Sequence, residues 1–129
     1  MTEAQLIALI KKKLIPDLQD TSEMNNKDGY SPRYDTVFEF KCREKHYDTL
    51  IIDKPKYDHL MKYNKVRYIC STPEGVFSWN LKKLPEPIWD ERLMRSSTWY
   101  HREIDEVIKK IGYLAIKDAK DLTKILFSK

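Results

Sequence analysis

Two side chains of opposite charge stand two residues apart in the stretch Phe38-Glu39-Phe40-Lys41-Cys42-Arg43. The aromatic residues favour a β-strand, in which successive side chains point to opposite faces. Glu39 and Lys41 therefore share one face with Arg43, while Phe38, Phe40 and Cys42 share a face with the composition of a core. The charged face is either a solvated outer surface or a site that holds a carboxylate beside an ammonium group.

A second carboxylate precedes this strand on the far side of Ser31-Pro32-Arg33, which has the composition of a turn. In an antiparallel hairpin that turns near residues 32–33, Asp28 falls opposite residues 37–39. Two carboxylates would then converge with Lys41 alongside. Because like charges repel, a cation is expected between them, and carboxylate oxygens suit Mg²⁺.

Asp28 followed by Glu39-Phe40-Lys41 resembles the Asp…(Asp/Glu)-x-Lys signature of the PD-(D/E)xK nuclease superfamily. The resemblance covers roughly residues 15–81, and the extended run at 28–61 with the hairpin YICSTPEGVFSWNL is similar to small phage-encoded members. The proline that precedes the motif aspartate in the superfamily is absent, because Lys27 stands there. Asp28 is the first choice for this position. Asp35 and Asp17 are the alternatives.

The resemblance implies a Mg²⁺-dependent nuclease, with Mn²⁺ as a substitute, that cuts DNA internally at phosphodiester bonds. It implies that Asp28 and Glu39 bind the ion, with the Phe40 carbonyl as third ligand, and that Lys41 positions the attacking water or stabilises the transition state. The resemblance implies DNA, duplex or branched, as the substrate and a cytoplasmic location, which is the host cytoplasm for a phage-encoded protein. It leaves the oligomeric state open between a monomer and the homodimer with which many small members cut both strands.

Two other functions remain open at the level of sequence. One is a nuclease-fold protein without catalysis that serves as a nucleic-acid-binding or virion component. The other is a protein interaction module that docks through the segment LPEPIW. The second of these would be favoured if Glu39 and Lys41 paired with charges of neighbouring strands on an open face.

Basic and aromatic side chains follow the motif strand closely. Basic groups contact phosphates, and tyrosines stack on or hydrogen-bond to nucleic acid. The predicted nucleic-acid contacts are Arg43, Lys45, His46, Lys54, Lys56 and Tyr57.

The element pattern predicts an α/β (α+β) fold, and the resemblance implies the αβββαβ core of restriction-endonuclease-like proteins, with a mixed sheet flanked by helices. The expected elements are a helix at 2–14, strands at 27–30 and 34–43, a brief strand at 50–52, a helix opened by Asp53 and Pro55, and a hairpin at 66–81 that turns at 72–75. Residues 82–103 are expected as a long loop or arm, 103–116 as strand or helix, and 117–129 as a closing helix.

Length and composition favour one domain over residues 1–129, with a core at about 1–81 and an arm with closing elements at 82–129. The net charge of +4 permits a polyanionic partner without demanding one. Cys42 and Cys70 have no metal-site spacing and are expected as reduced thiols. Because no apolar stretch could span a bilayer and the N-terminus lacks the order of a signal peptide, a soluble, membrane-free protein is expected.

Overall fold

The computed structural model describes residues 1–20, 28–95 and 106–128, and for residues 20, 28, 94, 95, 106 and 107 it describes the backbone alone. The larger sheet has the strand order β1 (Gln19–Asp20), β2 (Asp28–Ser31), β3 (Thr36–Cys42), β5 (Val66–Thr72), β6 (Gly75–Asn80) and β9 (Lys120–Asp121). The second sheet has the order β4 (Thr49–Asp53), β8 (Glu106–Ala115) and β7 (Asp90–Arg95). The helices are α1 (Glu3–Lys13), α3 (Lys54–Leu60) and α4 (Thr123–Phe127), with 3₁₀ turns η1 (Leu81–Lys83) and η3 (Ile116–Asp118).

Helix α1 confirms the helix expected at residues 2–14. Thr2 caps it, because its hydroxyl accepts from the Gln5 amide at 3.1 Å and the Gln5 side chain accepts from the Thr2 amide at 2.8 Å. Leu6 and Ile10 recur at helical spacing, and both are fully buried against the sheet. The apolar stripe of α1 thus fixes the helix on one face of the larger sheet.

Both hairpins expected from turn chemistry are present. β2 and β3 are joined by residues 32–35 and pair antiparallel, and β5 and β6 are joined by Pro73 and Glu74. Gly75, which ends the second turn, has a φ of 151°, a backbone conformation that favours glycine. β4 and α3 then connect β3 to β5, which pair in parallel. The mixed sheet and flanking helices of the expected α+β class are therefore confirmed.

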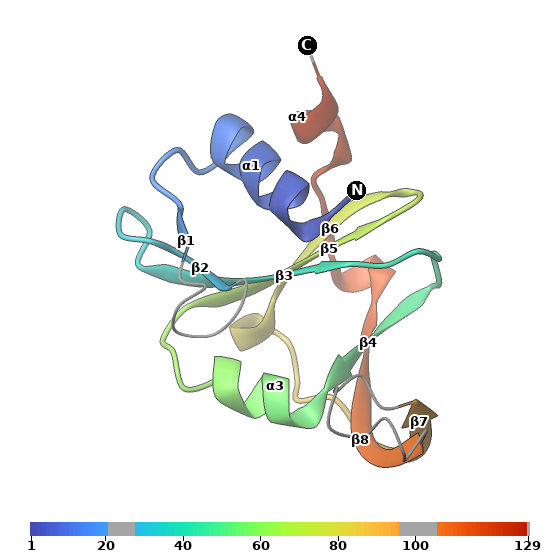
Figure 1. Ribbon diagram of the computed structural model, residues 1–129. Helices are drawn as coiled ribbons and strands as arrows, with labels where there is room; N and C mark the ends of the chain where they lie inside the picture. Colours follow the sequence, from blue (N-terminus) through green and yellow to red (C-terminus); the bar gives the residue numbers. More distant parts are fainter. Residues whose placement is uncertain (21–27, 96–105, 129) are drawn as a thin grey trace.

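The larger sheet is covered on both faces (Figure 1). α1 and α4 lie together on one face, where Phe38 and Phe40 of β3 enter their core. α3 and the second sheet lie on the other face, where the core includes Tyr57, Leu60 and Trp79. The face of β3 that carries Glu39 and Lys41 is therefore an interior face, and the reading of that face as a solvated outer surface was wrong.

The C-terminal third is more structured than its sequence indicates. The segment 82–103, expected as a long loop or arm, contains β7, and its residues 96–103 lie outside the described residues. The ambiguous segment 103–116 contains β8, which pairs with both β4 and β7. The expected closing helix is present as the short α4, which follows η3 and β9.

Within the described part of the chain, no helix is long and apolar enough to cross a membrane.

Candidate active site

Asp28 and Glu39 stand directly opposite each other. The Cα register of β2 and β3 pairs Asp28 with Glu39, and it continues through Tyr30 and Val37 to the turn. Directly paired positions of an antiparallel ladder lie on the same face of the sheet. The predicted approach of these two positions across the hairpin is therefore confirmed at the level of the backbone. β3 runs on for three residues past this pair, beyond the described part of β2, so Phe40 and Lys41 lie at the open end of the hairpin.

Glu39 is a buried carboxylate. Only 5% of the residue is exposed, because α3 crosses this face of the sheet. The Nζ atom of Lys56, on the first turn of α3, lies 3.5 Å from Oε2 of Glu39. The predicted nucleic-acid contact Lys56 therefore belongs to the site itself, where it balances the charge that burial would otherwise make costly. The ion pair joins a helix to a strand across an interior face, so the open face that would favour an interaction module is not found at Glu39.

Lys41 and Arg43 continue the charged column along β3. The parallel register places Lys41 beside Cys70 and Glu39 beside Tyr68 of β5. Arg43 donates to the Ile51 carbonyl of β4 at 3.0 Å. This contact holds Arg43 between the two sheets, so its guanidinium supports the site from within.

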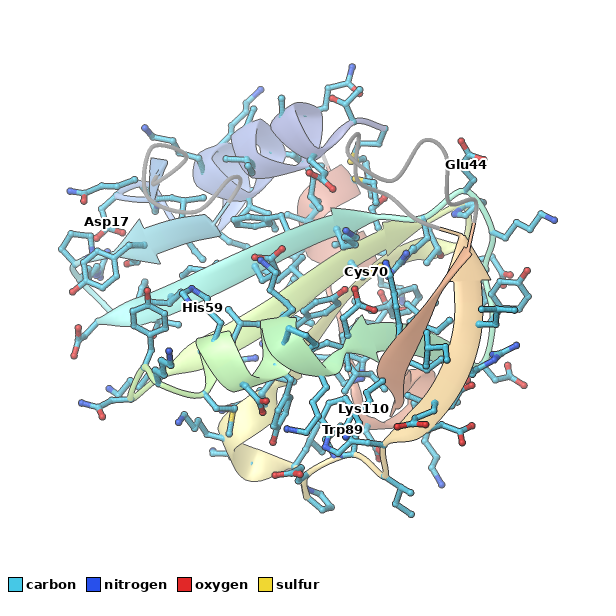
Figure 2. The ribbon with its side chains drawn as sticks, turned by 60° about the horizontal axis from the view of Figure 1, so that its bottom comes forward. Asp17, Glu44, His59, Cys70, Trp89 and Lys110 are labelled. Carbon is cyan, nitrogen blue, oxygen red and sulfur yellow. The ribbon has the colours of Figure 1, made fainter. Side chains whose placement is uncertain are left out.

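The neighbouring strand supplies two buried ionisable groups that the sequence analysis did not single out. Burial raises the pKa of the Tyr68 hydroxyl, and burial raises the pKa of the Cys70 thiol to about 11, while Arg43 opposes both increases. Figure 2 shows Cys70 in the interior, between the larger sheet and the second sheet. Their signal in the sequence is weak, since Tyr68 and Cys70 simply alternate within an apolar hairpin strand.

The alternative aspartates lie at the other end of the hairpin. Asp35 is in the turn rather than in β3, has a φ of 47°, and accepts from the Tyr30 hydroxyl at 2.8 Å. Asp17 accepts from the Arg33 amide at 2.7 Å and from the Ser31 hydroxyl at 2.9 Å. These hydrogen bonds lower the pKa of the Asp17 carboxyl. Both residues fasten the turn, and Figure 2 shows Asp17 at that end of the sheet.

The remaining predicted nucleic-acid contacts have different surroundings. Tyr57 is 5% exposed and its ring packs against Trp89 at 5.2 Å, so Tyr57 is a core residue and its prediction as a surface contact was wrong. Lys54 pairs with Asp58 at 2.7 Å on the outer side of α3. Lys45 is exposed just after β3.

His46 fastens the loop after β3 to the second hairpin. Its Nδ1 atom lies 2.8 Å from the Thr72 hydroxyl, and its ring packs 5.5 Å from that of Phe77. The Nε2 atom is 3.9 Å from a Glu74 carboxylate oxygen. His46 therefore has a structural role in the described part of the chain, through contacts with Thr72, Glu74 and Phe77 of the second hairpin.

A groove adjoins the site beside the start of α3. Its volume is about 540 Å³, and its lining includes two acids, Asp53 and Asp58, beside four lysines: Lys54, Lys56, Lys109 and Lys110. Lys56 is common to this groove and to the Glu39 ion pair. The two β8 lysines could not be placed from sequence, because β8 itself was ambiguous there.

Some of the oxygen atoms at this site are suitable ligands for a hard cation. A buried carboxylate, the position of a second one opposite and an adjacent backbone carbonyl are oxygen donors of the kind that Mg²⁺ binds. Among the side chains that the structure describes, no group of three or more His, Cys, Asp or Glu residues forms a metal site, and Asp28 is described by its backbone alone. Oxygen donors of this kind can hold a cation, and an ammonium group, that of Lys56, already lies beside the buried carboxylate.

Comparison of the chain with protein-family models, with curated proteins and with solved structures found no match.

Proposed function

We propose that this chain is a Mg²⁺-dependent nuclease that hydrolyses phosphodiester bonds of DNA, with Mn²⁺ as a substitute ion. The observation that carries the proposal is the register that sets Asp28 opposite Glu39, with Lys41 two residues further along the same interior face. The element order α1, β1, β2, β3, α3, β5, interrupted only by β4, supports the αβββαβ core that the motif implies. The parallel pairing of β3 with β5 supports the same core.

In this proposal Asp28 and Glu39 hold the ion, together with the Phe40 carbonyl. A bound Mg²⁺ polarises the scissile phosphate and lowers the pKa of the attacking water. Lys41 places a fixed positive charge where negative charge accumulates on the phosphate, a contribution of about 2.7–4 kcal/mol by analogy with a single oxyanion-hole donor. A lysine suits this point-charge role better than the broad, planar fork of arginine.

The groove beside α3 provides a path for the substrate backbone. Lys56, Lys109 and Lys110 line it, and lysines contact phosphates without regard to sequence. Because Lys56 also neutralises Glu39, it links the groove to the buried carboxylate. The three lysines support recognition of the phosphate backbone. A homodimer that cuts both strands remains part of the proposal.

The test is a cleavage assay on labelled duplex, single-stranded and branched DNA, with RNA in parallel, in Mg²⁺, in Mn²⁺ and in EDTA. We expect metal-dependent cleavage that falls at least about 100-fold in Glu39→Gln, Lys41→Ala and Asp28→Asn, because each removes an ion ligand or the transition-state cation. Asp118→Asn and Lys117→Ala, on exposed residues of η3, are the matched controls and should cut like the wild type.

Two outcomes would contradict the proposal. Undiminished cleavage by Asp28→Asn would remove Asp28 from the site, and absence of cleavage by the wild type with either ion would remove catalysis altogether. Calorimetric titration of Mg²⁺ into wild type and Glu39→Gln gives a readout that is independent of cleavage.

One observation favours a second function, a nuclease-fold protein that binds nucleic acid without cutting it. The 3.5 Å contact between Lys56 and Glu39 already neutralises the buried carboxylate with a side chain of the protein. Such a protein would bind DNA in EDTA with a steep salt dependence and would show no heat of Mg²⁺ binding.

A further inference from the structure

A second groove lies on the face of the larger sheet opposite Glu39. α1 and α4 cover the part of this face that holds Phe40 and Val76. Another part forms a groove of about 620 Å³, with Phe38 of β3 and Arg67 of β5 in its floor. Because β3 alternates its side chains, this groove and the candidate active site use opposite sides of the same strand.

The groove is lined by cations and lacks acids. Lys65, Arg67, Lys82, Lys83 and Lys120 line it from four different elements or loops, and no Asp or Glu is among its lining residues. Within the described part of the chain, none of these five side chains forms an ion pair with a carboxylate. Like charges gathered in one concave surface repel each other, so the groove gains free energy from a bound polyanion.

The cations are held in place by the fold. Arg67 donates to the Ser78 hydroxyl at 3.3 Å in the floor, and Lys82 donates to the Met61 carbonyl at 2.8 Å. The Asn80 side chain caps η1 by accepting from the Lys82 amide at 3.2 Å, which sets Lys82 and Lys83 on the rim. Lys120 of β9 is fixed beside Ser78 by strand pairing. Arg67 and Lys82 are thus held by side-chain hydrogen bonds, and Lys83 and Lys120 by the position of their backbone, which lowers the entropy cost of binding.

An aromatic ring stands at one end of this groove. Tyr34 is 46% exposed and lines the groove, and the Arg33 guanidinium lies over its ring at 5.4 Å. An exposed ring next to a row of phosphate-binding cations is the combination with which proteins hold single strands, because each unpaired base presents a face for stacking. A duplex would hide those faces, and an acidic protein segment would leave the ring without a stacking partner.

We propose that this groove binds a single strand of nucleic acid, with its phosphates on Lys65, Arg67, Lys82, Lys83 and Lys120 and one base on Tyr34. This surface is separate from the Glu39 site, and its occupation does not depend on catalysis. Both a strand of DNA and a strand of RNA have the required chemistry, and the experiment below distinguishes them.

The test measures fluorescence anisotropy of labelled 20-nucleotide strands with the full chain in EDTA, so that no cleavage intervenes. We expect Lys83→Ala/Lys120→Ala to weaken binding at least about tenfold at low salt and to reduce the slope of log K against log salt by about 1.4, two phosphate contacts at about 0.7 each. Lys117→Ala/Lys124→Ala removes the same charge outside the groove and is expected to change neither value appreciably. Parallel DNA and RNA strands identify the preferred sugar.

A second variant tests the aromatic contact. Tyr34→Leu should weaken single-strand binding by about fivefold or more while leaving the salt slope unchanged, because stacking releases no counterions. Equal losses in the two double variants, tighter binding of duplex than of single strands, or displacement by polyglutamate as readily as by an oligonucleotide would each overturn the proposal. Because the readout is binding in EDTA, loss of the nuclease activity alone would leave this result unaffected.

Discussion

Lys56 and Lys54, two residues apart on α3, show how the burial of a lysine's partner determines what the ion pair contributes to the stability of the protein. Both side chains are 32% exposed, and both contact a carboxylate. The partner of Lys54 is Asp58, whose side chain is 51% exposed, whereas the Glu39 side chain is 6% exposed. Removing Lys56 leaves the buried Glu39 carboxylate without this partner, whereas removing Lys54 leaves the Asp58 carboxylate hydrated by solvent. The two positions therefore form a natural pair for comparison.

We expect Lys56→Met to lower the free energy of unfolding by about 1–3 kcal/mol, less than for a fully buried ion pair because Lys56 is partly hydrated. Lys54→Met, the matched control, should cost no more than about 0.5 kcal/mol, as for exposed pairs four residues apart on a helix. Urea unfolding of both variants measures the difference.

A double-mutant cycle isolates the contact itself. Glu39→Gln/Lys56→Met should lose less stability than the sum of the two single changes, by about 0.5 kcal/mol or more, because the charge that Lys56 balances is absent. Strict additivity, or equal losses at Lys54 and Lys56, would show that the pair does not stabilise the protein.

Single residues were predictable where their role is local. The start of the helix expected at 2–14 was predictable because its capping side chains, Thr2 and Gln5, lie within one turn of the helix. The hydrogen bonds of Asp17 to Ser31 and Arg33 in the first turn could not be predicted. These residues are brought to Asp17 only by the pairing of β1 with β2. Tyr57 was misread as a surface residue because its burial depends on Trp89, which is distant in sequence.

At the scale of elements, the turn of β5 and β6 fastens the C-terminal helix. The Thr123 hydroxyl accepts from the Val76 amide at 3.1 Å, and the Leu122 amide donates to the Val76 carbonyl at 2.9 Å. Gly75 lies beneath this contact, where an added Cβ atom would overlap the Thr123 hydroxyl. Its φ of 151° is also unfavourable for other residues.

Gly75→Ala should therefore lower the free energy of unfolding by about 1–3 kcal/mol. Thr123→Ala should also destabilise, by about 0.5–1.5 kcal/mol, through the lost hydrogen bond. In the double variant the added Cβ atom no longer overlaps the Thr123 hydroxyl, so the loss in free energy of unfolding should be smaller than the sum of the losses of the two single variants. Thermal unfolding of the three proteins gives these values, and additive losses would contradict steric contact between the two residues.

Hairpins were predictable as elements, and the second sheet was not. β2 with β3 and β5 with β6 carry their turn residues and strand patterns within a short stretch of chain. β7 has the sequence DERLMR, and β8 mixes lysines with apolar residues, so neither has a clean period. Their strand conformation is decided by the pairing of β8 with β7 and with β4, which lies far earlier in the chain, and composition alone does not reveal such pairing.

At the scale of the whole molecule, the candidate site lies in the interior because α3 and the second sheet, which are not part of its motif, cover it. The motif predicted that Asp28, Glu39 and Lys41 share a face, and the register of Asp28 with Glu39 followed from hairpin geometry. The burial of Glu39 could not be predicted, because it depends on how α3 and the second sheet pack across that face. A charged face on a strand is exposed or enclosed according to what the rest of the chain places over it.

Cys70 offers a reporter of this enclosure. The thiol is fully buried and its pKa is about 11, so at pH 8 about one thiol in a thousand is ionised. We expect one thiol, Cys42, to react promptly with a chromogenic disulfide reagent, and Cys70 to react only when the protein unfolds. Cys42→Ser leaves Cys70 alone and should show the slow phase by itself, accelerated by urea. A prompt reaction in that variant would contradict the enclosed interior.

The alternation of β3 has a further consequence for how the two proposed surfaces would act together. Phe38 faces the cationic groove, and Glu39, the next residue, faces the candidate site. A long strand tethered in the groove would hold its remaining length near the opposite side of one thin sheet, at an effective concentration on the order of millimolar. The protein would then encounter successive segments of one molecule rather than a succession of separate molecules.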